Sequence, residues 1–336
     1  MRFIFSILGV LFLSLHLQGQ DLHSSNYRYA PLYLNPALAG HFPGTMRLGG
    51  NYRDQGRQLL YQGYQSGQAF MDMPLAASFR DMDWSGIGFN AYSDQAGLLP
   101  VTSNGVILSL SHHLSLDKKQ SNILSGGIQY GFIQRKLNED DIVLESDHVD
   151  PGVQLTDRNS LLAYEEKYND LNAGIHFRSG KLSGNHFQIG ISAYHLIQTN
   201  AQFLSDKNFY NRRFTLHSLY KFELVKGVSL QPEIIVSMAE EAMVIMPQVK
   251  SFFKLKKDEK NTDMFYAGAG YRYGDAMQVI LGMNFQGWDF GFAYDVTVSS
   301  ASNYNQMRGG LEVGISRIFS LPQKPKTIPV RICTRM

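Results

Sequence analysis

The polar residues with the clearest spacing for chemistry lie in the last quarter of the chain. Arg272, Asp289 and Asp295 each stand between two large apolar residues. On β-strands this spacing places the three side chains on the face that carries the small and polar residues. Arg272 there could bind an anion, but an internal ion pair is the commoner arrangement. Asp289 and Asp295, on the same face, are its candidate partners.

The other titratable residues do not form a catalytic or metal-binding pattern. The chain contains no nucleophile elbow, no phosphate-binding loop and no HExxH pair. His112 and His113 are adjacent, so on a strand their side chains point in opposite directions. His195, among apolar residues, is interpreted as structural. We therefore predict no catalytic residues, no cofactor and no metal site.

An acidic segment, residues 138–170, is the one stretch considered as a candidate for cation binding. It lacks the regular spacing of oxygen ligands found in calcium loops. We interpret it as a solvated external loop. Its acidic residues include Glu139, Asp140, Asp141, Glu145, Asp147 and Asp150.

Composition restricts the class of protein. Charged residues make up 18% of the 336 residues and aromatic residues 12%, and the formal net charge is +2. Soluble domains usually carry about 25% charged residues. The small net charge argues against a dedicated nucleic-acid binder. The single cysteine, Cys333, excludes a disulfide framework and a cysteine-cluster metal site.

The N-terminus has the features of an export signal. Arg2 precedes an apolar run from Phe3 to Leu15, which predicts a signal peptide over residues 1–20, cleaved near Gly19 or Gln20. The run is shorter than the roughly 20 apolar residues of a membrane anchor. No later run has the length of a transmembrane helix. The chain is therefore predicted to be exported without a helical anchor.

Alternation of large apolar with small or polar residues predicts that most of the chain is strand. The segment WDFGFAYDVTV, residues 288–298, shows it most clearly. We predict an all-β fold, a transmembrane antiparallel β-barrel of about 14 strands, with the aromatic side of this segment facing lipid. The strands are predicted to begin near residues 46, 66, 85, 103, 123, 170, 185, 211, 227, 243, 263, 276, 287 and 308.

Glycines recur on the polar faces of these strands, where they would relieve crowding inside a barrel. They are Gly126, Gly127, Gly174, Gly190, Gly268, Gly270, Gly282 and Gly291. The same arrangement is harder to explain on the wet face of a soluble sandwich.

Within residues 21–45, the stretch from Ala30 to Gly40 is apolar, unlike a solvated tail, and Pro31, Pro36 and Pro43 prevent a regular strand or helix. We predict that residues 21–45 form a plug or hatch in the barrel mouth. An ordinary buried coil is the alternative. The residues on which this prediction depends are Pro31, Tyr33, Asn35, Pro36, Ala37 and Gly40.

An ordered series of motifs along the chain resembles the PorP/SprF family of the type IX secretion system. The opening motif is PLYLNPALAG, residues 31–40, followed by NYRDQ at residues 51–55. Later matches are Gly86-Ile87-Gly88, Asp170-Leu171-Asn172-Ala173-Gly174, Ile189-Gly190-Ile191-Ser192-Ala193-Tyr194-His195-Leu196, Tyr294-Asp295-Val296-Thr297-Val298-Ser299 and Gly309-Gly310-Leu311-Glu312. The chain departs from the family pattern at Gly310-Leu311 and in its last four residues.

The resemblance implies a non-enzymatic barrel in the outer membrane of a Gram-negative bacterium. Its partners would be outer-membrane lipid, type IX secretion components and a secreted surface protein such as an adhesin, in some relatives one for gliding motility. The expected organisation is a signal peptide (1–20), a plug segment (21–45), a barrel (46–320) and a C-terminal tail (321–336). The alternatives are a channel similar to long-chain fatty-acid transporters and a soluble secreted β-protein.

Overall fold

The structure is a computed structural model of the whole chain. It describes residues 24–56, 63–75, 80, 82–96, 101–137, 165–197, 200–203, 206–209, 211–240, 242–255, 263–300, 302 and 306–320. The predicted signal peptide, the acidic residues 139–150, Cys333 and the predicted C-terminal tail lie outside these ranges.

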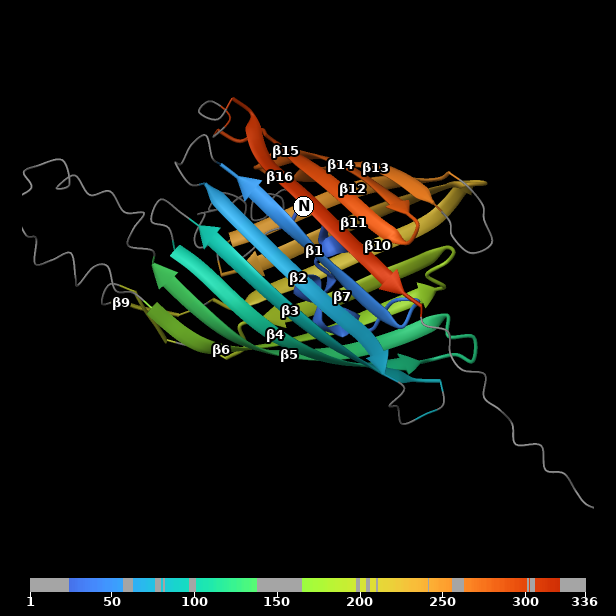
Figure 1. The fold of residues 1–336 in the computed structure, drawn as a ribbon, viewed down its shortest axis with the longest axis horizontal. Helices are drawn as coiled ribbons and strands as arrows, with labels where there is room; N and C mark the ends of the chain where they lie inside the picture. Colours follow the sequence, from blue (N-terminus) through green and yellow to red (C-terminus); the bar gives the residue numbers. More distant parts are fainter. Residues whose placement is uncertain are drawn as a thin grey trace, which may run out of the picture.

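Fourteen strands close into one antiparallel barrel, in which β1 pairs with β16 (Figure 1). The predicted fold class is confirmed. In chain order the barrel strands are β1 (Met46–Gln55), β2 (Tyr64–Leu75), β3 (Trp84–Ala96), β4 (Val101–Ser115), β5 (Asn122–Leu137), β6 (Glu165–Gly180), β7 (His186–Tyr194), β10 (Arg213–Val225), β11 (Val228–Ala239), β12 (Ala242–Lys254), β13 (Met264–Arg272), β14 (Ala276–Phe285), β15 (Trp288–Thr297) and β16 (Arg308–Phe319).

The strands begin close to where the sequence places them, with one exception. β6 begins at Glu165, whereas the alternation pattern predicts a start near residue 170. The residues before Asp170 are polar on both faces, so they carry no alternation signal. A hairpin of β8 (Asn200–Phe203) and β9 (Asp206–Phe209) forms a separate two-stranded sheet. Its strands are too short for a clear pattern, and the sequence did not predict them.

The outer face of the barrel carries many large apolar side chains. Along β15, Trp288, Phe290 and Phe292 are 38%, 42% and 40% exposed, whereas Asp289 and Asp295 are 5% and 1% exposed. The aromatic side of WDFGFAYDVTV therefore faces outward and its acidic side faces the lumen. No helix in the described ranges is long and apolar enough to cross a membrane.

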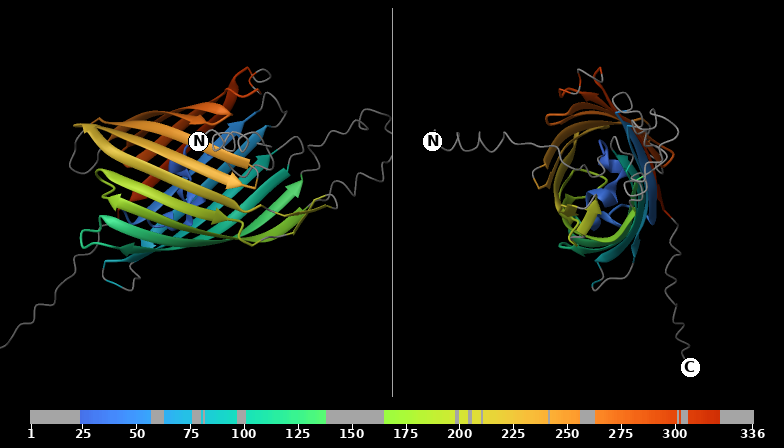
Figure 2. Two further views of the ribbon diagram at one scale, coloured as in Figure 1. Left: turned by 180° about the vertical axis from the view of Figure 1, so that it is seen from behind. Right: turned by 90° about the vertical axis from the view of Figure 1, so that its left-hand side faces the viewer.

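The two ends of the barrel differ. At one end, here the turn end, β1 begins, β16 ends, and Gly227 and Gly287 lie in two-residue turns. At the other, here the loop end, residues 138–164 connect β5 to β6. β4, β5 and β6 contain 15, 16 and 16 residues, more than the roughly 9–11 that cross a bilayer. At the loop end these three strands extend beyond the other barrel strands (Figures 1 and 2).

Residues 24–44 lie inside the barrel and are called the inner segment here (Figure 2). The inner segment contains three short helical turns, η1 (Tyr27–Tyr29), α2 (Pro31–Leu34) and η2 (Pro36–Leu38). Pro31 and Pro36 occupy the first positions of α2 and η2, where the missing backbone N–H is not needed. Much of the buried apolar surface belongs to this segment, including Tyr29, Leu32, Ala37 and Ala39.

Candidate functional site

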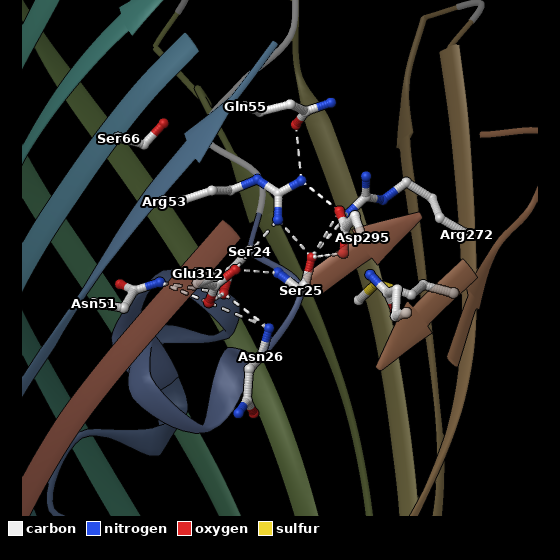
Figure 3. A network of polar contacts seen from close by, with 12 residues as sticks. Ser24, Ser25, Asn26, Asn51, Arg53, Gln55, Ser66, Arg272, Asp295 and Glu312 are labelled. Carbon is white, nitrogen blue, oxygen red and sulfur yellow. Dashed lines mark hydrogen bonds and ion pairs between the residues drawn. The ribbon is translucent and has the colours of Figure 1, made fainter. Parts of the chain in front are cut away.

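The first half of the inner segment is held by two buried carboxylates of the barrel wall. The backbone N–H of Ser25 donates to Glu312 Oε2 at 2.6 Å, and the Ser24 hydroxyl donates to Glu312 Oε1 at 2.5 Å. The Ser25 hydroxyl donates to Asp295 Oδ1 at 2.8 Å. Glu312 and Asp295 are 2% and 1% exposed. Two adjacent serines are thus bound from β16 and β15 (Figure 3).

Two arginines neutralise these carboxylates (Figure 3). Arg53 Nη2 lies 2.6 Å from Asp295 Oδ2, and its Nη1 lies 3.4 Å from Glu312 Oε2. Arg272 Nη2 lies 3.0 Å from Asp295 Oδ2. Both guanidinium groups also donate to the Ser25 hydroxyl, at 2.5 and 3.0 Å. Buried charges are tolerated when paired and hydrogen-bonded in this way. The cluster of Arg53, Arg272, Asp295 and Glu312 is called the charged seat here.

Asp289 holds the next turn of the inner segment. It accepts hydrogen bonds from the Arg28 guanidinium and the Tyr29 hydroxyl. The Tyr29 hydroxyl also lies 2.8 Å from the hydroxyl of Tyr266 on β13. The Arg28 guanidinium lies 5.6 Å from the centre of the Tyr266 ring, within the range of a cation–π contact.

The second half of the inner segment rests on glycines. A Cβ built on Gly127 would lie 2.5 Å from the backbone nitrogen of Ala37, and one on Gly88 would lie 2.8 Å from Leu32. A Cβ on Gly86 would overlap the carbonyl oxygen of Ala39, and one on Gly174 would overlap Asn35. At Gly86 and Gly127 the backbone of the inner segment approaches the wall more closely than a side chain on the wall would permit, and at Gly88 and Gly174 side chains of the segment do so. These four residues, with Gly190, are called the glycine seat here.

Asn35 fixes the inner segment over the glycine seat. Its Oδ1 accepts from the backbone N–H of Ala37 at 2.9 Å and so caps η2. Its Nδ2 donates to the carbonyl oxygens of Ile175 at 3.0 Å and Ile191 at 3.3 Å. One amide thereby links the inner segment to β6 and β7, and Asn35 is completely buried.

Comparison with known proteins identifies the family. The family model described as type IX secretion system membrane protein PorP/SprF matches residues 16–308. This range includes the inner segment and all barrel strands up to the start of β16. The chain belongs to the PorP/SprF family.

Solved structures share the barrel fold with this family member. The toluene transporter TbuX of Ralstonia pickettii has a TM-score of 0.50 at 9% identity, covering 87% of this chain and 94% of TbuX. The toluene transporter TodX of Pseudomonas putida has a TM-score of 0.46 at 9% identity, covering 88% of this chain and 93% of TodX. No curated protein sequence matches this chain. At these identities the likeness concerns the fold alone.

Five of the six residues named for the plug contact the barrel or cap a turn, and all six are buried. The Tyr33 ring stacks on Tyr194 with centroids 6.0 Å apart. Pro36 and Ala37 lie against Gly127. The N–H of Gly40, at φ 67°, donates to Asp72 Oδ2 at 2.8 Å. Asn35 contacts the wall as described above, and Pro31 opens α2.

The three residues named for the lumen face divide between two sites. Arg272 and Asp295 meet in the charged seat, and Arg272 also binds Asp275 at 2.8 Å. Asp289 instead binds Arg28 of the inner segment. Local sequence patterns do not single out Ser24, Ser25, Arg53, Asp72 or Glu312 as site residues. Arg53 and Glu312 stand in the family motifs NYRDQ and GGLE, which was the available signal.

His112, His113 and His195 make hydrogen bonds or ion pairs within the barrel, as structural residues do. His113 lies inside the barrel, and its Nε2 donates to the carbonyl oxygen of Ala39 at 2.8 Å, whereas His112 points outward to Ser85. His195 Nδ1 lies 3.2 Å from Asp170 Oδ1. Within the described ranges, no group of three His, Cys, Asp or Glu residues is arranged to hold a metal ion.

Proposed function

We propose that this protein works with the type IX secretion system in the outer membrane of a Gram-negative bacterium. It supports the secretion or surface attachment of particular partner proteins such as adhesins, including adhesins used in gliding motility. The observation that carries the proposal is the family match over residues 16–308. The apolar outer face of the closed barrel supports lipid as the surrounding medium.

We propose further that the inner segment is a resident plug and that the loop end faces the exterior. In bacterial barrels the longer connections are extracellular and the short turns periplasmic. The inner segment is bound by the charged seat and the glycine seat on opposite sides of the lumen. This supports the proposal that the segment stays in place. Partner proteins would then be handled at the surface of the barrel and not through its lumen, and no catalysis is involved.

A channel for a hydrophobic small molecule is the weaker alternative. Such a channel needs an apolar passage. The lumen around the inner segment instead carries Arg53, Arg272, Asp289, Asp295 and Glu312. The similarity to toluene transporters lies in the fold, and it does not outweigh this polar lining.

The test compares surface and culture-fluid proteins of wild-type cells, a strain lacking this gene, and the same strain with the gene restored. The proposal expects the deletion to lose one or a few large surface proteins, which the restored gene returns. An unchanged protein profile with impaired uptake of a hydrophobic nutrient would instead establish the transporter alternative.

A further inference from the structure

The outer face of β16 carries one charged side chain, and it lies near the turn end. Leu311, Val313 and Ile315 alternate along this face and are exposed. Arg317 follows two positions later, so its side chain lies on the same outward face. It stands two residues before the last residue of the strand. The charge is therefore at the edge of the apolar band and not in its middle.

Two aromatic rings hold the Arg317 guanidinium. Its central carbon lies 4.8 Å from the centre of the Trp288 ring and 5.0 Å from the centre of the Phe319 ring. Both distances are within the range of cation–π contacts. Trp288 is the direct neighbour of Arg317 across the sheet, where β15 and β16 run side by side (Figure 1). The rings fix the position of the guanidinium without using its N–H donors.

Within the described ranges, no acidic residue pairs with Arg317 and no residue accepts a hydrogen bond from it. Its direct neighbours across the sheet are Leu48 and Trp288. Asp289 points into the lumen, where it binds the inner segment. Asp263, in the turn before β13, accepts from a backbone N–H of the β14–β15 turn at 3.0 Å. The guanidinium thus presents its charge and its donors to the surroundings of the barrel.

The outward side chains at this level are those of a membrane boundary. Trp288 is exposed, and exposed phenylalanines continue along the turn end at Phe285 on β14, Phe265 on β13 and Phe253 on β12. Such an aromatic belt lies at the level of the lipid headgroups. Among the groups found there, a phosphodiester matches a guanidinium, because its oxygens can accept two parallel N–H bonds.

We propose that Arg317, Trp288 and Phe319 form a binding site for the phosphodiester group of one phospholipid in the leaflet at the turn end. Arg317 donates a pair of hydrogen bonds to the phosphate oxygens, and the two rings hold the guanidinium at headgroup level. Ile315 and Val313, further along the same outward face, contact the acyl chains. The lipid surroundings, and this leaflet as the periplasmic one, rest on the proposed function.

Native mass spectrometry of the purified full chain in a mild detergent tests the site, with palmitoyl-oleoyl phosphatidylglycerol as the probe. Arg317→Gln removes the charge. The matched control is Lys226→Gln, which removes the charge of an exposed lysine in the β10–β11 turn at the same end of the barrel. We expect Arg317→Gln to weaken binding of the first lipid by about tenfold or more, and Lys226→Gln to leave it unchanged. Heat-modifiable migration on gels confirms that each barrel has folded.

Arg317→Lys is the second variant, and it decides the matter if Arg317→Gln does not fold. It keeps the charge but loses the planar pair of donors. We expect it to bind the first lipid several-fold more weakly than the wild type. Binding equal to that of the wild type would overturn a paired contact with phosphate.

Two further outcomes would overturn the proposal. Equal weakening in Arg317→Gln and Lys226→Gln would reduce the effect to the net charge of the turn end. Displacement of the lipid by an excess of inorganic phosphate would show a site for a free anion. Neither outcome affects the secretion role, because the measurement does not involve surface proteins. A deletion strain that lost no surface protein would overturn the proposed function and leave the lipid result standing.

Discussion

The inner segment meets the barrel wall in two chemically different ways. Around Ser24 and Ser25, the wall contributes four charged side chains, and the contacts are hydrogen bonds to carboxylates and guanidinium groups. Around Pro36 and Ala37, the wall contributes glycine, and the contact is backbone against backbone. The charged seat provides groups that bind, whereas the glycine seat provides space.

This difference determines how each seat responds to mutation. In the charged seat, removal of one partner leaves other buried charges without compensation, which is costly. In the glycine seat, addition of one carbon is sufficient at Gly86 and Gly127, because the atoms that it meets there belong to the backbone of Ala39, Pro36 and Ala37 and cannot rotate away. Substitutions that remove side-chain atoms should therefore weaken the charged seat. Substitutions that add side-chain atoms to glycine should weaken the glycine seat.

The largest effect is expected for Asp295→Ala. The substitution leaves the Arg53 and Arg272 guanidinium groups without their shared carboxylate and should lower the free energy of unfolding by about 3–5 kcal/mol. Asp275→Ala is the matched control, because Asp275 binds the same Arg272 but its side chain is 40% exposed. There we expect about 1 kcal/mol or less. Urea unfolding in lipid vesicles measures both, and equal midpoint shifts would refute the role of burial.

The second-largest effect is expected for Gly127→Ala. The new methyl group would lie 2.5 Å from the backbone of Ala37, so docking of the inner segment should weaken by roughly 1–3 kcal/mol. Gly126→Ala is the matched control, because a Cβ at Gly126 meets nothing within 4 Å. The measurement is maleimide labelling of Leu34→Cys in a Cys333→Ser background. We expect Leu34→Cys to be labelled at least tenfold faster when Gly127→Ala is present. With Gly126→Ala the labelling rate should not change. Similar rates in both variants would contradict a close fit at Gly127.

The same two glycines show what the sequence could and could not provide. Alternation is a local signal, and it placed thirteen of the fourteen barrel strands within two residues of their observed starts. The assignment of both Gly126 and Gly127 to the polar face was wrong for Gly126. Adjacent residues of a strand face opposite sides, and Gly126 is on the exposed outer face.

The seats themselves depend on pairs that no local pattern reveals. Ser25 and Glu312 are 287 positions apart, and Arg53 and Asp295 are 242 positions apart. Apolar composition predicted that residues 30–40 need burial, but the partners of these residues follow from closure of the barrel. The family motifs marked Arg53 and Glu312 as members of a pattern without indicating their contacts.

A smaller effect is expected where both kinds of contact meet, at Asn35. Asn35→Ala removes the cap of η2 and the donor to the carbonyl oxygens of Ile175 and Ile191. The loss of these hydrogen bonds should weaken docking by about 1–2 kcal/mol. Asn35→Ser retains an oxygen that can cap Ala37 and should recover about half of that loss in the labelling assay. Identical labelling of the two variants would show that the cap contributes nothing.

The smallest effect is a dependence on pH that arises at His41, next to the glycine seat. Burial lowers the pKa of His41 well below its usual value, and His176, His113, Arg178 and Arg47 lower it further. The ring centroids of His41 and His176 are 4.7 Å apart. The docked ring is therefore neutral, whereas a released inner segment would expose a histidine with an ordinary pKa of about 6.5.

The sign of the effect follows from this difference. Above pH 6.5 both forms are neutral, and docking has its full strength. As pH falls below 6.5, only the released form binds a proton, so docking weakens by about 1.4 kcal/mol per pH unit. Labelling of Leu34→Cys should accelerate several-fold between pH 6.5 and 5.5, corrected for reagent reactivity. His41→Phe preserves a buried ring without a proton site and should abolish the acceleration. If His41→Phe kept the slope, the charged seat and its carboxylates would be the source of the pH dependence.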